Sequence, residues 1–279
     1  MEIARSIAEF RALRATVPTL GLVPTMGFLH EGHLSLVRRA RSECGAAAAT
    51  IFVNPTQFAA NEDFSSYPRA LERDLDLLRA EGCAFAFVPS GPEVMYPAGF
   101  DTRIEIGGVT GMLEGAVRPG HFDGVATVVA KLLNITQPTR AYFGQKDAQQ
   151  CVVVRKLVRD LDMPVEIVVC RTVRTEDGLA MSSRNAYLSP PERQAALVVI
   201  RALRAAEADF TAGQRDAGAL RATMREVLSG EALAAIDYVS AAHPETLAEL
   251  DEVGAEGALL SLAVRIGKTR LLDNLVLGL

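Results

Sequence analysis

Residues 23–33 read VPTMGFLHEGH and lie between a short apolar run, residues 20–23, and an amphipathic segment, residues 34–40. The apolar run predicts a buried strand, and the amphipathic segment predicts a helix. Two histidines, His30 and His33, therefore fall on the turn from a strand into a helix. A helix N-terminus has unpaired N–H groups and the positive end of the helix dipole, and both suit an anion. The stretch thus predicts a nucleotide-phosphate site in an α/β fold.

Two other roles are open to the histidine pair. The rings could be purely structural, or they could bind a metal together. A metal site normally needs a third and a fourth ligand, and no cluster of cysteine or aspartate follows in the sequence. Imidazole N–H groups can donate to phosphate oxygens, so we expect His30 and His33 to contact phosphate.

Apolar runs alternate with amphipathic segments over about the first 170 residues. This alternation predicts an α/β fold with a doubly wound, Rossmann-like parallel sheet, whose ligand binds beyond the carboxyl ends of the strands. Strands are predicted at residues 19–23, 46–53, 83–88, 139–143 and 165–169, and helices at residues 2–14, 33–44, 68–81, 122–136 and 147–161.

The pattern changes after about residue 186. Long helices rich in alanine, leucine and arginine are predicted at residues 190–211 and 216–228, and strands at 236–241 and 258–266. We therefore predict two domains. A nucleotide- and substrate-binding catalytic domain is expected over residues 1–185, and a smaller α+β domain over residues 186–279.

Charge and cysteine content narrow the class of protein. The net charge is −5, whereas nucleic-acid binding calls for a basic face. No apolar run approaches the ~20 residues that span a bilayer, and the charged segment 1–14 does not resemble a signal peptide. The four cysteines form no C-x-x-C pair, which favours buried thiols in a reducing compartment. We expect a cytoplasmic protein that binds small molecules, and neither nucleic acid nor membrane.

Two motifs follow predicted strands and carry amide or cationic side chains. Asn54 and Gln57 belong to NPTQF, where amides suit the hydroxyl and carboxylate groups of a small acid; an Asn-Pro turn is the alternative. In FGQKDAQQ, Gly144 permits close backbone approach, Lys146 supplies a point charge and Asp147 could hold ribose hydroxyls. The alternative for this second motif is an ordinary capped helix.

Three further features are less specific. MSSRN, residues 181–185, places two hydroxyls before a cation, which suits triphosphate oxygens. The glycine-rich segment 107–124 contains Glu114, Arg118 and His121, and is either a lid or a long surface loop. Asp74 could meet Mg²⁺, although we favour a solvated helix acid.

These motifs resemble those of a known family. H-x-G-H at residues 30–33 is similar to the signature of the nucleotidyltransferase superfamily, and MSSR is similar to its K-M-S-K-S loop. Residues 24–189 resemble pantothenate synthetases, although Phe28 stands where alanine is frequent. The resemblance rests on strings that occur in the family's order: PTMGFLHEGH, IFVNPTQF, YPR, LEG with RPGHFDGV, YFGQKDAQQ, VRTEDGLAMSSRN and YLS.

The resemblance implies an ATP-dependent ligase that joins pantoate to β-alanine through a pantoyl adenylate and releases AMP and pyrophosphate. It implies Mg²⁺ with the triphosphate and a homodimer. His30, His33, Lys146 and Arg184 would be catalytic, with His33 at the family's proton-donor position.

The resemblance also implies the binding residues. Gln57, Gln150 and Asn54 would bind substrate. The ATP-binding residues would be Met26, Gly27, Phe28, Leu29, His30, Glu31, Gly32, His33, Gly144, Gln145, Lys146, Asp147, Val173, Met181, Ser182, Ser183 and Arg184.

Two alternatives stay open at this point. Another nucleotidyltransferase could make a dinucleotide or a charged tRNA, but the acidic balance argues against tRNA. A catalytically dead nucleotide-binding regulator is the second alternative. Intact Lys146 and both histidines argue against it, because a dead copy has no need of a complete set of charges.

Overall fold

The computed structural model describes residues 1–59 and 64–278. The chain divides into two compact units: Met1–Gly144 with Gln150–Arg171, the first unit, and Gln145–Gln149 with Thr172–Leu279, the second unit. The assignment of functions to domains 1–185 and 186–279 stays a prediction. Within the described residues no helix is long and apolar enough to cross a bilayer.

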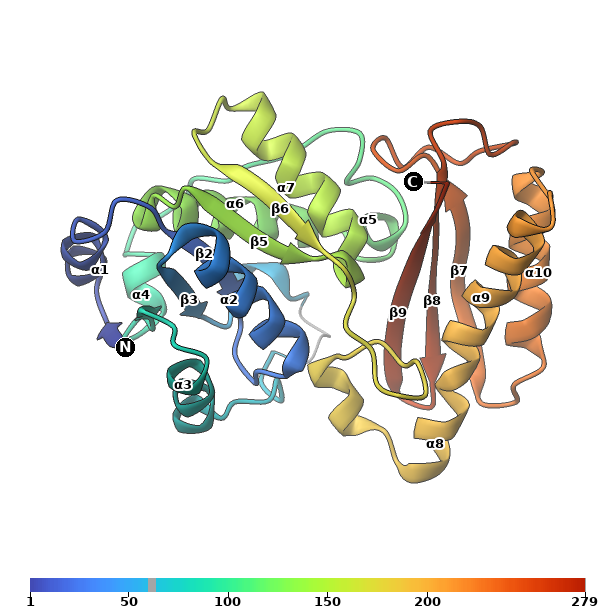
Figure 1. Ribbon diagram of the computed structural model, residues 1–279, viewed down its shortest axis with the longest axis horizontal. Coiled ribbons are helices and arrows are strands. Elements are labelled where there is room, and N and C mark those ends of the chain that lie inside the picture. Colours follow the sequence, from blue (N-terminus) through green and yellow to red (C-terminus); the bar gives the residue numbers. More distant parts are fainter. Residues whose placement is uncertain (60–63, 279) are drawn as a thin grey trace. The chain divides into compact units, whose positions relative to one another are not determined.

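The first unit contains a six-stranded sheet in the order β1-β4-β3-β2-β5-β6, and every pairing is parallel (Figure 1). This confirms the predicted α/β class with a parallel sheet. The strand order runs in opposite directions on the two sides of β2, so the β2–β5 junction is the switch point where such sheets bind ligands. The strands are β1 (Glu2–Ala4), β2 (Gly21–Thr25), β3 (Ala47–Ile51), β4 (Phe85–Phe87), β5 (Arg140–Gly144) and β6 (Glu166–Cys170).

Apolar side chains cover both faces of this sheet. On one face, Val37 of α2 and Leu78 of α3 share a buried cluster with Ala86 of β4. On the other, Phe10 of α1 packs edge-on against Phe85 and Phe87, which alternate with Ala86 along the strand. The helices are α1 (Ile7–Arg14), α2 (Glu31–Cys44), α3 (Leu71–Ala80), α4 (Pro92–Met95), α5 (Glu114–Val117), α6 (His121–Thr136) and α7 (Ala148–Asp160), with the 3₁₀ turn η1 (Pro55–Gln57).

The predicted helix at residues 2–14 is wrong at its start. Residues Glu2–Ala4 pair with β4 as a strand, and the helix begins only at Ile7. Ser6 caps it by accepting from the Glu9 N–H, while the Glu9 carboxylate accepts from the Ser6 N–H. This reciprocal capping fixes the helix start, because it satisfies amides that the first turn leaves unpaired.

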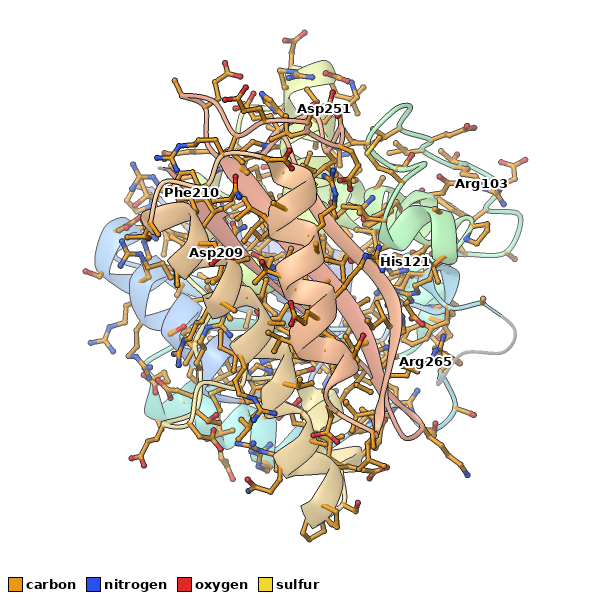
Figure 2. The ribbon with its side chains drawn as sticks, turned by 90° about the vertical axis from the view of Figure 1, so that its right-hand side faces the viewer. Arg103, His121, Asp209, Phe210, Asp251 and Arg265 are labelled. Atoms are coloured by element: carbon orange, nitrogen blue, oxygen red, sulfur yellow. The ribbon has the colours of Figure 1, made fainter. Side chains whose placement is uncertain are left out.

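The second unit packs helices on a three-stranded antiparallel sheet in the order β7-β8-β9. Figure 2 labels Asp209 and Phe210, which lie next to each other on α9. Asp209 accepts from the Thr223 hydroxyl of α10 (2.6 Å), and the Arg215 guanidinium lies 4.1 Å from the centre of the Phe210 ring. The elements are η2 (Gln145–Asp147), η3 (Ser183–Tyr187), α8 (Pro190–Ala195), α9 (Leu197–Thr211), α10 (Ala217–Ser229), β7 (Ala234–Ala242), β8 (Ala258–Ile266) and β9 (Thr269–Leu277).

Two predictions for this unit need correction. The helix expected over residues 190–211 is broken at Ala196 into α8 and α9. Strand β9 was absent from the expected elements. Asp273 and Asn274 interrupt its apolar pattern, yet both are buried, with 2% and 3% of their surface exposed. A buried polar pair in mid-strand hides the strand from an analysis of hydrophobic alternation.

Candidate active site

The turn after β2 has an unusual backbone. Gly27 (φ +88°) and Phe28 (φ +52°) both lie in the left-handed region, which residues other than glycine rarely adopt. The Asp74 carboxylate accepts from the N–H groups of Phe28 (2.7 Å) and Leu29 (2.8 Å). These two hydrogen bonds hold the strained turn and so fix where α2 begins.

Asp74 is therefore not the solvated acid that the sequence favoured. Only 1% of its surface is exposed, because the left-handed turn folds over it. Contact with Mg²⁺ at Asp74 stays a prediction. Among the residues described, no three His, Cys, Asp or Glu side chains form a group that could hold a metal.

The histidine rings at the start of α2 have a defined orientation. The His30 Nδ1 accepts from the Gly32 N–H (3.2 Å), and the His33 Nδ1 accepts from the His30 N–H (3.3 Å). A nitrogen that accepts carries no proton, so each neutral ring has its proton on Nε2. The two ring centroids lie 4.1 Å apart, which brings two Nε2–H donors to one helix N-terminus.

Gly32 explains the spacing of the motif. A Cβ at this position would lie 2.9 Å from both Cε1 and Nδ1 of His30. Any side chain would thus push the His30 ring from its place on the Gly32 N–H. Glu31, the remaining motif residue, pairs with Arg38 on the exposed side of α2.

A second polar group surrounds the turn η1 after β3. The Asn54 Nδ2 donates to the Gln57 Oε1 (3.0 Å), and the Gln57 Nε2 lies 3.4 Å from the Met26 Sδ. The Asn54 Oδ1 accepts from the Thr56 N–H (3.3 Å), the Thr56 hydroxyl (3.0 Å) and the Tyr96 hydroxyl (2.7 Å). The structure thus brings the predicted substrate residues Asn54 and Gln57 together with Met26.

Helix α6 packs directly against η1 through Gly124. The Asn54 Nδ2 also donates to the Gly124 carbonyl (3.1 Å). A Cβ on Gly124 would lie 2.3 Å from the Thr56 carbonyl oxygen, so only glycine lets the helix approach this closely. Asn54 is consequently buried, with 1% of its surface exposed.

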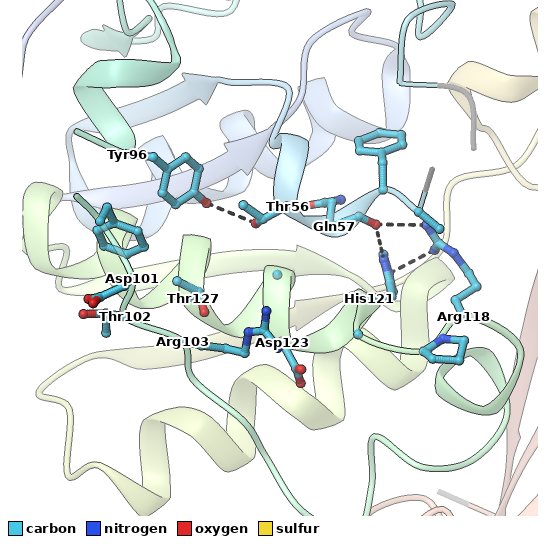
Figure 3. Close-up of a pocket in the computed structure, with 16 residues that line it drawn as sticks. Thr56, Gln57, Tyr96, Asp101, Thr102, Arg103, Arg118, His121, Asp123 and Thr127 are labelled. Atoms are coloured by element: carbon cyan, nitrogen blue, oxygen red, sulfur yellow. Dashed lines mark hydrogen bonds between the residues drawn. The ribbon is translucent and has the colours of Figure 1, made fainter. Parts of the chain in front are cut away.

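The segment 107–124, for which sequence analysis left two roles open, contacts Gln57. The His121 Nδ1 lies 2.8 Å and the Arg118 Nη2 3.4 Å from the Gln57 carbonyl oxygen, and Arg118 Nη1 lies 3.0 Å from His121 Nε2 (Figure 3). These residues line a cavity of about 340 Å³ together with Thr56 and Tyr96. Within the segment, α5 and the start of α6 are helical, and Glu114 is 7% exposed. A lid function stays a prediction.

Gln150, the third predicted substrate residue, is half-buried on α7. The described residues offer its side chain no hydrogen-bond partner. Its neighbour Gln149, in contrast, is 5% exposed. An amide with unused hydrogen-bonding capacity on a helix surface is suited to a polar ligand.

In the second unit, one small cavity has six polar residues in its lining: Lys146, Ser182, Arg184, Asn185, Arg270 and Asp273. The Ser182 hydroxyl accepts from the Arg184 N–H (3.3 Å) and so caps η3. The three cations outnumber the single carboxylate of Asp273, although Arg270 also pairs with Asp237 (2.5 Å), so the excess positive charge favours an anion. Lys146 lies 3.3 Å from Asp147, whose side chain is half exposed.

The missed strand β9 holds these loops. The Asn274 Nδ2 donates to the carbonyl oxygens of Gln145 and Lys146, both at 2.9 Å. Asp273 accepts two hydrogen bonds from Arg174 (2.5 and 2.9 Å), and Arg174 also donates to the Gly178 carbonyl (3.2 Å). The loop closes through the Met181 N–H, which donates to the Val173 carbonyl (3.0 Å). In the sequence, the one sign that β9 holds these loops is the polar pair Asp273 and Asn274 within an apolar segment.

The cysteines give no sign of nucleophilic activation. All four are buried free thiols, as the sequence predicts. Burial raises the pKa of the Cys83 thiol to about 11, and burial also raises the pKa of Cys170. Thiolates are therefore disfavoured at both positions.

The whole chain is similar to proteins of one known family. The chain matches the Pantoate-beta-alanine ligase family over residues 2–276. It belongs to this family. It is 60% identical to the pantothenate synthetase of Chloroflexus aurantiacus, over 99% of this chain and 98% of that protein.

Solved structures of the ligase family agree with this assignment. The pantothenate synthetase of Thermus thermophilus is 50% identical, covers 99% of each chain and has a TM-score of 0.94. The pantoate-β-alanine ligase of Francisella tularensis, solved with beta-gamma ATP and β-alanine, is 35% identical with a TM-score of 0.81, over 99% of this chain and 97% of that one. The expected family and fold class are confirmed, and the individual site residues stay predictions.

The role of Asp74 in this ligase family member can be tested with Asp74→Asn. An asparagine oxygen can accept from one of the two amides, but its NH₂ group opposes the other. Leaving a buried N–H unpaired typically costs about 1–3 kcal/mol, so we expect a fall of this size in the free energy of unfolding in urea. Asp76→Asn is the control, because its side chain is 76% exposed on the same helix. Equal stability of the two variants would contradict the role of Asp74.

The ion pair of Asp177 with Arg193 predicts that the stability of the fold depends on pH in the acid range. Hydrogen bonds from Arg193 and then Thr175 lower its pKa from 3.8 to about 2. A carboxylate with a depressed folded-state pKa stabilises the fold above its unfolded pKa and loses this effect as the pH falls through the folded value. Between about pH 4 and pH 2, the Tm of Asp177→Asn should therefore fall less steeply than that of wild type. Circular dichroism melts measure this, with exposed Glu176→Gln as control; parallel slopes for wild type and Asp177→Asn would disprove it.

Proposed function

We propose that this chain joins pantoate to β-alanine at the expense of ATP, and releases AMP and pyrophosphate. The observation that carries the proposal is the turn at residues 26–33, where two Nε2–H donors stand at a helix N-terminus beyond a parallel strand. Membership of the ligase family supplies the substrates, since the Francisella tularensis relative was solved with beta-gamma ATP and β-alanine.

The chemistry proposed is two displacements. A carboxylate oxygen of pantoate attacks the α-phosphorus of ATP, and the bond to pyrophosphate breaks. The amine of β-alanine then attacks the acyl carbon of the adenylate, loses a proton and displaces AMP. Neither step needs a nucleophile from the protein, which agrees with the buried cysteines.

Catalysis then rests on positioning and on stabilising negative charge. We assign phosphate oxygens to His30 and His33 in the first unit, and to Lys146 and Arg184 in the second. Residues 26–29, 31, 32, 144, 145, 147, 173 and 181–183 complete the proposed ATP contacts. Gln57 and Gln150 are assigned to pantoate, because amides suit hydroxyl and carboxylate groups.

Mg²⁺ is proposed to enter with the triphosphate. Magnesium usually keeps several waters and binds through substrate phosphates with few protein ligands, so the residues described fit it without a cluster of three acidic or histidine side chains. The metal would supply positive charge to the phosphates. A homodimer is likewise proposed from the family resemblance. A cytoplasmic location is proposed because four free cysteines agree with a reducing compartment.

The two-step path predicts a partial reaction. With pantoate, ATP and Mg²⁺ but no β-alanine, the protein should exchange labelled pyrophosphate into ATP. The reason is that adenylate formation precedes the arrival of the amine and is reversible. Exchange is measured with and without pantoate, the latter being the control. Exchange that requires β-alanine would refute the adenylate path, and an absence of pantothenate in the complete mixture would refute the function.

The phosphate contacts predict losses of turnover. His33→Asn keeps a side-chain acceptor for the His30 N–H but removes the Nε2–H donor, and Lys146→Met removes the ammonium. Loss of one preorganised donor typically lowers kcat ~10²–10³-fold. Steady-state pantothenate formation measures the effect. His243→Asn and Lys156→Met are matched controls, since these side chains pair with Glu256 and Asp160. Wild-type turnover in either test variant would remove that residue from the mechanism.

A further inference from the structure

Tyr96 lies at the end of α4 and is connected through Asn54 to Gln57, one of the residues assigned to pantoate. Its hydroxyl donates to the Asn54 Oδ1 (2.7 Å), and the Asn54 Nδ2 donates to the Gln57 Oε1 (3.0 Å). The sequence analysis did not single out Tyr96, and the proposed mechanism does not use it. The three side chains form one series of hydrogen bonds, and the residues at its two ends, Tyr96 and Gln57, both line the cavity of Figure 3.

The neighbours of Asn54 fix the direction of donation in these hydrogen bonds. The Asn54 Oδ1 faces three donors: the Tyr96 hydroxyl, the Thr56 hydroxyl and the Thr56 N–H. The Asn54 Nδ2 faces two acceptors, the Gly124 carbonyl and the Gln57 Oε1. A flipped Asn54 amide would place donors against donors and oxygen against oxygen. Asn54 therefore has one orientation, and it always offers an N–H to Gln57.

That orientation determines what Gln57 presents to a ligand. With Oε1 accepting from Asn54, the Gln57 NH₂ group must point the other way. One of its two N–H groups is directed to the Met26 Sδ (3.4 Å), a weak acceptor. The other finds no acceptor among the described residues. Gln57 thus offers a donor, which matches a carboxylate or hydroxyl oxygen and not an ammonium group.

We propose that Tyr96 is a positioning residue that acts through Asn54, so that Gln57 presents an N–H donor to an oxygen of the hydroxy-acid substrate. The proposal rests on the proposed function, which assigns Gln57 to pantoate. It adds a determinant of substrate polarity, because the tyrosine hydroxyl is one of the three donors that set, through Asn54, which end of the Gln57 amide meets the substrate.

The surroundings of Tyr96 suit this role. Its ring packs against Phe52 and Phe100, with centroid distances of 6.1 and 5.2 Å, and the Lys131 ammonium lies 5.9 Å from its centre. Burial raises the pKa of Tyr96, so the hydroxyl keeps its proton at neutral pH. The aromatic packing restrains the ring and thereby the direction of the hydroxyl.

The test removes single hydroxyl groups. Tyr96→Phe should raise the Kd of pantoate about 2–10-fold, the value of one neutral hydrogen bond, and leave the Kd of ATP unchanged. Thr56→Val removes a second donor to Asn54 from an exposed residue, so it tests the same series of hydrogen bonds if Tyr96→Phe folds poorly. Tyr142→Phe is the control, because it removes a buried hydroxyl that donates to Glu43. Isothermal titration calorimetry gives each Kd.

A double-mutant cycle separates positioning from general damage. In a Gln57→Leu background, Tyr96→Phe should have no further effect on the Kd of pantoate, since the residue through which it acts is gone. The proposal is overturned if the two effects are additive, if Tyr96→Phe weakens ATP equally, or if Tyr96→Phe and Thr56→Val both leave the Kd of pantoate unchanged.

A spectroscopic readout keeps this test independent of the assignment of Gln57 to pantoate. The side-chain NH₂ resonances of Asn54 and Gln57 should shift in Tyr96→Phe and stay in place in Tyr142→Phe. If wild type binds no pantoate but these resonances shift, the proposed function fails while the positioning of Gln57 stands. If the resonances do not shift, the positioning role of Tyr96 fails whatever the substrate.

Discussion

The buried Asp74 carboxylate is the interaction on which the first unit's site depends. It holds two successive amides of a turn whose residues Gly27 and Phe28 are both left-handed. A turn of this kind is strained unless its surroundings fix it. Because the turn is fixed, α2 begins at a defined point, and its first amides in turn orient the rings of His30 and His33. The Asp74 carboxylate thus fixes the turn, the turn fixes the start of α2, and the start of α2 fixes the tautomers of the two imidazole rings.

The same principle operates in the second unit with different groups. Asp273 and Asn274 on β9 hold the loop around Arg174 and the carbonyl oxygens of Gln145 and Lys146. Both residues are nearly inaccessible to solvent, and the charge of the Asp273 carboxylate is compensated by the Arg174 guanidinium, which also donates to the Gly178 and Asn274 carbonyls. In each unit, the residues assigned to phosphate are half-buried at a helix start or in a 3₁₀ turn, and buried carboxylate or amide groups give those segments their shape.

Sequence patterns predicted those parts of the fold that depend on hydrophobic periodicity. The continuous apolar strands gave the parallel sheet, and the motifs after strand ends gave the family. Periodicity failed where polar groups are buried. It missed β9, because Asp273 and Asn274 break the apolar pattern, and it made Asp74 a solvated acid, because no local pattern reveals a partner more than forty residues away. It left His121 unassigned for the same reason, since Gln57 is 64 residues away in sequence. Long-range polar pairing is not encoded in local spacing.

The contact between Gly124 and the Thr56 carbonyl has a consequence for how substrate preference could change. Most residues of α6 are buried, so the helix cannot move without disturbing the core around it. Because the backbone of η1 rests directly on this helix, η1 has the mechanical stiffness of the core and not of a surface loop. Adaptation to a longer or bulkier acid would then have to come from exchanged side chains around a stationary backbone.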